Sequence, residues 1–227
     1  RALSEDALSG FPDGYFDWIY LDGNHEFDFG LKTFNERQKE AGFPFLAANI
    51  IAQGSVEIGT IGHMLQIVGG VKIGILGVVT PEIAAQTNPR NVAGLTFGDP
   101  VKAAQASALA LHEQGADYVI AIAHMTESAV LDLAQRVPGV DLIVAGGHEK
   151  ASRAILVRSL TRLVNGVQIV RTPRNGSYLG LVSVTFSRKG KGSRFGELKA
   201  NASLLRVGLD VPGDPEAEAL VGQLETA

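Results

Sequence analysis

A chain of 227 residues that is 45% hydrophobic and 19% charged, with a formal net charge of −4, has the composition of a folded protein with a substantial core. The sequence contains no cysteine, which excludes disulfides, thiolate metal sites and cysteine nucleophiles, and its slightly acidic balance argues against a surface that binds nucleic-acid polymers. No apolar stretch predicts a membrane span, and no signal-peptide pattern is visible at the N-terminus.

Hydrophobic periodicity divides the first two thirds of the chain into alternating strands and helices. Short apolar runs bounded by turn residues indicate strands, whereas apolar residues spaced three or four apart indicate helices. Gly69-Gly70 predicts a two-residue hairpin turn, and Asp99-Pro100 predicts the capped start of a helix. The expected elements are strand 16–21, helix 29–41, strand 45–50, hairpin strands 64–68 and 71–79, helix 100–114, strand 117–123, helix 126–137 and strand 141–145.

The pattern changes from about residue 154, where strands and turns replace the helices. Strand-like runs occur at 167–171, 179–186 and 195–209. A parallel α/β half followed by an antiparallel β half predicts a mixed α/β sandwich rather than a doubly wound dinucleotide-binding domain.

The octapeptide Gly-Asn-His-Glu-Phe-Asp-Phe-Gly at 23–30 is the most informative segment for function. It places an amide, an imidazole and two carboxylates directly after a predicted buried strand, where open α/β sheets bind their ligands. A turn would explain the glycine, asparagine and aspartate, but not the histidine or the glutamate.

His25, His124 and His148 each follow a predicted strand. Any one of them alone is more simply a structural histidine, but three at equivalent strand ends favour a divalent transition metal site.

Six segments together match a known family in the right order. They are GNHEFD at 23–28, FPFLAAN at 43–49, KIGILG at 72–77, AIAH at 121–124, VDLIVAGGH at 140–148 and YLG at 178–180. From Gly23 to about Phe186 the chain resembles the calcineurin-like metallophosphoesterases, and specifically the N-terminal domain of the bacterial 5′-nucleotidase/UDP-sugar hydrolase group.

This resemblance implies a four-layer αββα sandwich that hydrolyses nucleotides or related phosphomonoesters with a metal-activated hydroxide. The family uses two metal ions, which are expected here to be Mn²⁺ or Zn²⁺. By motif, Asn24, His124 and His148 would ligate a metal ion. His25 would protonate the leaving oxygen, and Asp28 would orient the imidazole of His25. No substrate-binding residue is assigned.

The sequence departs from the family pattern at both ends of the site. The Asp-x-His and Gly-Asp motifs that precede Gly-Asn-His in the family are absent upstream of it, so the sandwich is expected to lack its first strand units. The family's closing Gly-His-x-His is replaced by Gly147-His148-Glu149-Lys150, and Lys150 would repel a metal ion. These changes fall on the first metal, so a single metal ion is the alternative to two.

We assign residues 1–212 to one metallophosphoesterase-like domain, of which 1–22 are atypical for the family. Residues 213–227 are expected to be a terminal segment or a linker to a substrate-binding domain outside this chain. The family implies a periplasmic or extracellular location.

Two alternative functions stay open: a catalytically degenerate binding or scaffold domain of the same fold, and a fragment of a class I methyltransferase. The second rests on residues 11–26, which are similar to the fourth strand of those enzymes and its Asp-Gly-x-His loop.

Overall fold

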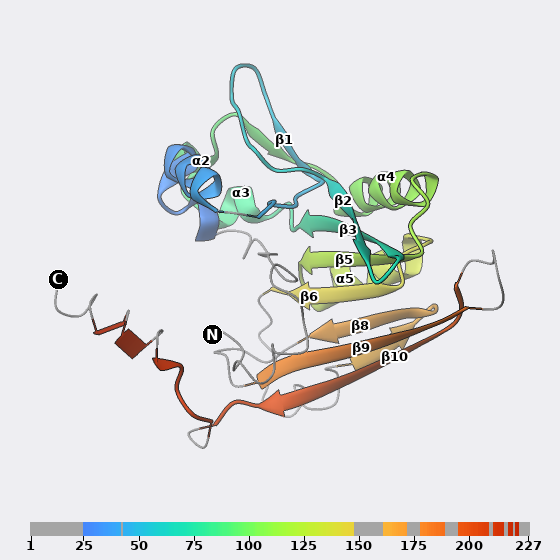
Figure 1. The fold of residues 1–227 in the computed structure, drawn as a ribbon. Helices are drawn as coiled ribbons and strands as arrows, with labels where there is room; N and C mark the ends of the chain where they lie inside the picture. The colour runs from blue at the N-terminus through green and yellow to red at the C-terminus, as the bar shows by residue number, and fades with distance from the viewer. Residues whose placement is uncertain are drawn as a thin grey trace.

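The computed structural model describes residues 25–41, 43–147, 161–171, 178–188, 195–208, 211–215, 218–219 and 221–222. Six strands in this part of the chain form a central sheet (Figure 1). They are β2 (His63–Val68), β3 (Val71–Val79), β5 (Tyr118–His124), β6 (Leu142–Gly146), β7 (Thr161–Val164) and β8 (Val167–Arg171). Their order across the sheet is β2-β3-β5-β6-β8-β7. Strands β3, β5, β6 and β8 are parallel, and β2 and β7 add antiparallel edges.

Two amphipathic helices connect the parallel strands and cover one face of the sheet. They are α4 (Pro100–Glu113) and α5 (Glu127–Arg136). The side chain of Asp99 caps α4 by accepting hydrogen bonds from two backbone N–H groups, and Thr126 caps α5 by accepting one. Leu111 and Leu133 are fully buried on the inner faces of these helices, where they join the largest apolar cluster of the described residues. This packing holds both helices against the sheet.

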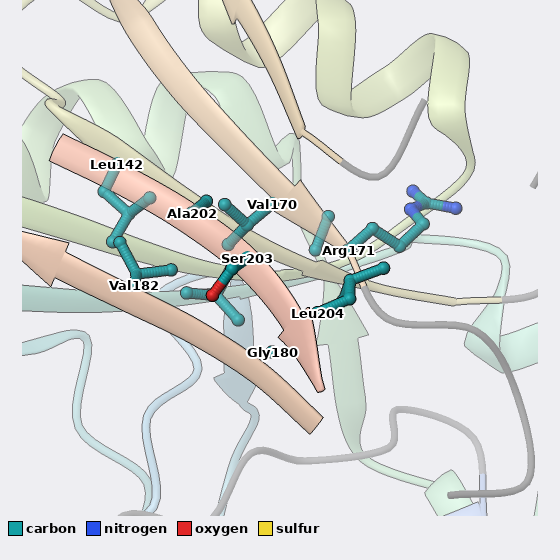
Figure 2. A pocket seen from close by; sticks show the side chains of 10 residues that line it. Leu142, Val170, Arg171, Gly180, Val182, Ala202, Ser203 and Leu204 are labelled. Atoms are coloured by element: carbon teal, nitrogen blue, oxygen red, sulfur yellow. The ribbon is translucent and has the colours of Figure 1, made fainter. Parts of the chain in front are cut away.

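A long hairpin lies against the opposite face of the sheet. It consists of β9 (Tyr178–Arg188) and β10 (Phe195–Arg206), which pair antiparallel. Figure 1 shows it alongside β8, and the ring of Phe186 meets Tyr118 edge-on with 5.5 Å between centroids. A cavity of about 240 Å³ remains between hairpin and sheet, with an apolar lining that includes Leu142 and Val182 (Figure 2). The expected mixed α/β sandwich is therefore confirmed: helices, central sheet and hairpin form successive layers.

A second, smaller cluster packs around a group of phenylalanines. Phe27 is fully buried, its ring centroid is 5.1 Å from that of Phe34, and both pack with Ile83. Figure 1 shows its helices beyond the arrowheads of β3, β5 and β6. The elements of this cluster are η1 (His25–Phe27), α2 (Gly30–Glu40), β1 (Ile50–Ala52), α3 (Ile83–Gln86), η2 (Pro89–Val92) and β4 (Leu95–Phe97).

Most of the expected elements are confirmed within a residue or two. The Gly69-Gly70 hairpin forms with both glycines at positive φ (58° and 83°), as a primed two-residue turn requires. The expected strand at 16–21 lies outside the described residues, and nothing tests the division of the chain at residue 212, which stays a prediction.

Two expectations are wrong. The segment 45–50 is not a continuous strand, because Leu46 makes only an isolated bridge to Ile61 and a turn precedes β1. This segment crosses the edge of β3 so closely that a Cβ at Gly77 would lie 2.2 Å from the Leu46 carbonyl oxygen. In addition, β8 runs parallel to β6 instead of belonging to an antiparallel half. An apolar run has the same pattern in either direction, so periodicity could not distinguish them.

Candidate active site

His124 lies at the carboxyl end of β5, as the sequence predicts, and only 3% of it is exposed. Its register partners are Val79 on β3 and Gly146 on β6. The backbone carbonyl of His124 accepts a hydrogen bond from the Thr80 N–H at 2.9 Å. The position of His124 is therefore set by backbone ladders on both sides.

Asn49 completes the sheet next to this strand end. Strand β2 pairs with β3 only as far as Leu76, and no strand of the described residues pairs with Val79 on that side. The Asn49 side chain, in a residue 1% exposed, takes that place: its Oδ1 accepts from the Val79 N–H at 2.9 Å, and its Nδ2 donates to the Val79 carbonyl at 2.7 Å. Nδ2 also donates to the carbonyl of Gly98 at 3.0 Å. A buried carboxamide thus satisfies both the N–H and the carbonyl of Val79 at the end of β3.

His25 and Asp28, the predicted catalytic pair, are brought together by the 3₁₀ turn η1. The Nδ1 atom of His25 lies 2.8 Å from Oδ2 of Asp28, and the Asp28 N–H donates to the His25 carbonyl at 3.1 Å. Their side chains are 56% and 45% exposed. A carboxylate at this distance can accept a hydrogen bond from Nδ1 and so orients the imidazole ring. Such a pair, open to solvent, suits proton exchange with a small molecule.

Asn91 holds the same turn from a distant part of the chain. It belongs to η2, and its Nδ2 donates to the carbonyl oxygens of Phe27 and Asp28, both at 2.8 Å. Sequence reasoning missed this residue. The only local signal is Asn88-Pro89, which predicts a capped turn at 88–92 but says nothing about its partner.

The predicted metal ligands are only partly covered by the structure. His124 has the ligand chemistry and the fixed position of a metal-binding histidine. Asn24 and His148 lie outside the described residues. Among the residues that the structure describes, no group of three or more histidine, cysteine or acidic side chains could hold a metal ion. The described donors alone therefore do not make a metal centre, and the three-ligand set stays a prediction.

The strongly perturbed titratable groups lie at the other end of the central strands. Burial raises the pKa of Tyr118 to about 12, and the charge of Asp141 adds to this effect. Burial also raises the pKa of Asp141, against the opposing effects of the Val119 N–H and of His112. Tyr118 begins β5 and His124 ends it, about 20 Å away at the usual rise per residue. These two groups therefore do not belong to the candidate site at the other end of β5.

Comparisons with known proteins give a family match and several similar proteins. Residues 4–151 match the family model of the calcineurin-like phosphoesterases. The snake venom 5′-nucleotidase of Naja atra is 31% identical over 221 residues, which cover 89% of this chain and 40% of that protein. This chain therefore spans about two fifths of the length of that curated relative.

Solved structures agree with this match. The calcineurin-like phosphoesterase YfkN from Bacillus subtilis superposes with a TM-score of 0.71 at 26% identity, covering 90% of this chain and 68% of that one. The 5′-nucleotidase precursor from Thermus thermophilus gives a TM-score of 0.66 at 26% identity, with 90% and 42% covered. No helix in the described part of the chain is long and apolar enough to cross a membrane.

Proposed function

Because the chain belongs to the calcineurin-like phosphoesterase family, whose members generally use divalent metal ions, we propose that it hydrolyses phosphomonoesters of nucleotides or related small molecules. The observation that supports this proposal is the His25–Asp28 contact at 2.8 Å. The resemblance of residues 23–28 to the family motif gives His25 the role of general acid in this proposal. A nucleotide is the favoured substrate because the relatives with about 30% identity are named 5′-nucleotidases.

In this proposal His25 gives a proton to the leaving oxygen of the phosphoester. Asp28 holds Nδ1, so the ring keeps one orientation and Nε2 is the atom that would deliver the proton. With 56% of its side chain exposed, His25 is open to a substrate from solution. The Asp28 carboxylate would stabilise the positive charge of the ring when both ring nitrogens carry a proton.

Metal ions would supply the activated water and stabilise the charge on the phosphoryl group. We propose Asn24, His124 and His148 as ligands and Mn²⁺ or Zn²⁺ as the ion. The support for His124 is its fixed strand end beside β3 and β6. Export to the periplasm or cell exterior, and substrate selection by a further domain, stay predictions.

One other function has an observation in its favour. Lys150 stands where the family places a metal ligand, which favours a scaffold domain that keeps the fold without the chemistry. The methyltransferase alternative is not pursued, because the family match includes residues 11–26, the segment on which it rested.

The test is release of phosphate from AMP and p-nitrophenyl phosphate by the purified chain, with added Mn²⁺ and with chelator, beside bound-metal analysis. We expect chelator-sensitive turnover that falls by about 100-fold in His25→Ala. Asp132→Asn, which removes one carboxylate from a surface pair on α5, serves as the control and should be unaffected. A chain that binds metal weakly or not at all, and turns over no faster than His25→Ala, would contradict the proposal and favour the scaffold function.

A further inference from the structure

We propose that Asn91 is a positioning residue for the His25–Asp28 pair, acting through the backbone of the turn that carries both side chains. Its Nδ2 is within 2.8 Å of two consecutive carbonyl oxygens, those of Phe27 and Asp28, although 63 residues separate Asn91 from Asp28. The relevance of this clamp to turnover rests on the proposed function, whereas its effect on the turn does not.

The two carbonyls need a donor from elsewhere. Helix α2 begins at Gly30, with Phe29 at its N-cap position and no side-chain cap. The carbonyls of Phe27 and Asp28 precede the cap and so do not enter the hydrogen-bond ladder of the helix. A carboxamide nitrogen carries two hydrogens, which is one for each of these oxygens. Asn91 therefore ties the end of η1 to the start of α2.

The ion pair cannot hold the turn by itself. His25 and Asp28 are about half exposed, and an ion pair of that kind contributes little because water screens it. Two further contacts anchor the turn: the fully buried ring of Phe27 fixes it to the core below, and Asn91 binds its carbonyls from the side. Loss of the second anchor leaves Phe27 in place but lets the Asp28 backbone rotate. A displacement of about 1 Å at a reacting group can lower a rate by about 100-fold.

The chain provides a matched control for this contact. Asn88 caps the short element η2 and Asn91 lies within it, but Asn88 uses its side-chain oxygen, which accepts from the Arg90 N–H at 3.1 Å. Asn91 uses its side-chain nitrogen. Asparagine to aspartate keeps the shape and exchanges the nitrogen for oxygen. Asn88→Asp therefore keeps its contact, whereas Asn91→Asp loses both donors and places oxygen against two carbonyl oxygens.

Three measurements on the wild-type chain and the two aspartate variants test the proposal. They are amide hydrogen exchange across residues 25–29, kcat and KM for p-nitrophenyl phosphate with Mn²⁺, and urea unfolding. Asn91→Asp should speed exchange of the Asp28 amide by about 10-fold and lower kcat by about 10- to 100-fold with little change in KM. Asn88→Asp should match the wild type. Asn91→Ala removes the donors without adding charge and should show the same changes as Asn91→Asp. If Asn91→Asp does not fold, Asn91→Ala takes its place in the comparison.

The outcomes separate this inference from the proposed function. Unchanged exchange at residues 25–29 in Asn91→Ala overturns the clamp, whatever the activity. Faster exchange with unchanged kcat overturns the positioning role. A wild-type chain without turnover contradicts the proposed function instead, and the exchange rates then still decide whether Asn91 orders the turn.

Discussion

His124 and His25 are held by two different kinds of contact. His124 is 3% exposed, and the backbone ladders of β3 and β6 fix it on both sides. His25 is on a solvent-facing turn, where its contacts include the carboxylate of Asp28 and, through the backbone, Asn91. His124 is therefore held by the sheet itself. The orientation of His25 depends on side chains whose loss we do not expect to unfold the protein.

This difference predicts that changes near the two histidines have different consequences. Around His124 the polar contacts are buried, so a lost partner leaves a backbone group unsatisfied and lowers the free energy of unfolding. Around His25 water replaces lost partners, so stability changes little and the geometry of the site changes instead. Three variants near the two histidines test this separation, and a fourth, at Tyr118, concerns the opposite end of β5. They follow from the largest expected effect on stability to the smallest.

Asn49→Asp should cause the largest loss of stability. It replaces a nitrogen that donates to Val79 and Gly98 by an oxygen, and it buries an unpaired negative charge in a residue 1% exposed. Breaking a buried polar pairing in this way lowers the free energy of unfolding by about 3 to 5 kcal/mol. Urea unfolding measures it, with the surface variant Asn88→Asp as control at less than about 0.5 kcal/mol. Equal midpoints for the two variants would show that Asn49 does not support the strand end.

Gly77→Ala should come next. An added Cβ would lie 2.2 Å from the carbonyl oxygen of Leu46 and 2.6 Å from its carbon, and backbone atoms cannot move aside as a flexible side chain can. Overpacking of this kind lowers the free energy of unfolding by about 1 to 3 kcal/mol. Gly98→Ala is the matched control, because its Cβ would meet the Asn49 carbonyl at an ordinary 3.6 Å. A Gly77→Ala chain as stable as Gly98→Ala would mean that segment 45–50 can move away from β3.

The sequence predicts the contacts that position His124 much better than the contacts that position His25. Apolar runs end at His124, and Gly69-Gly70 and Asp99-Pro100 each determine a local structure, so the strand ends follow from periodicity and turn chemistry. The role of Asn91 follows from neither periodicity nor turn chemistry. A side chain that donates to a backbone 63 residues away leaves no periodic signal. Asn49 is intermediate: its motif is recognisable, but its pairing with Val79 shows only in the fold. The direction of β8 is missed for the same reason, since strand direction is a property of the whole sheet.

Tyr118, at the opposite end of the strand that carries His124, should make the fold sensitive to high pH. Burial, and to a lesser extent the charge of Asp141, raises its pKa from 10.0 to about 12. In the unfolded chain the phenol loses its proton near pH 10, so between pH 10 and 12 the folded state binds more protons. Stability is therefore complete below pH 10 and falls as the pH rises, by about 1 kcal/mol between pH 10 and 11. Urea unfolding at pH 9 to 11 should show this slope in the wild type and a smaller one in Tyr118→Phe. Equal slopes would mean that other groups cause the alkaline loss.

Asp28→Asn should change stability least and turnover most. The pair with His25 is about half exposed, so its loss should lower the free energy of unfolding by less than about 0.5 kcal/mol. The amide can still accept from Nδ1 but carries no charge to stabilise the imidazolium, so we expect kcat to fall by about 10- to 100-fold. Asp132→Asn removes one carboxylate from a comparable pair, Arg136 and Asp132 at 2.8 Å, and should change neither quantity. If Asp28→Asn lowered stability as Asn49→Asp does, the turn would be part of the core rather than an adjustable support. If it left both stability and kcat unchanged, the His25–Asp28 contact would be a surface ion pair like that of α5, and the acid would have to be sought elsewhere.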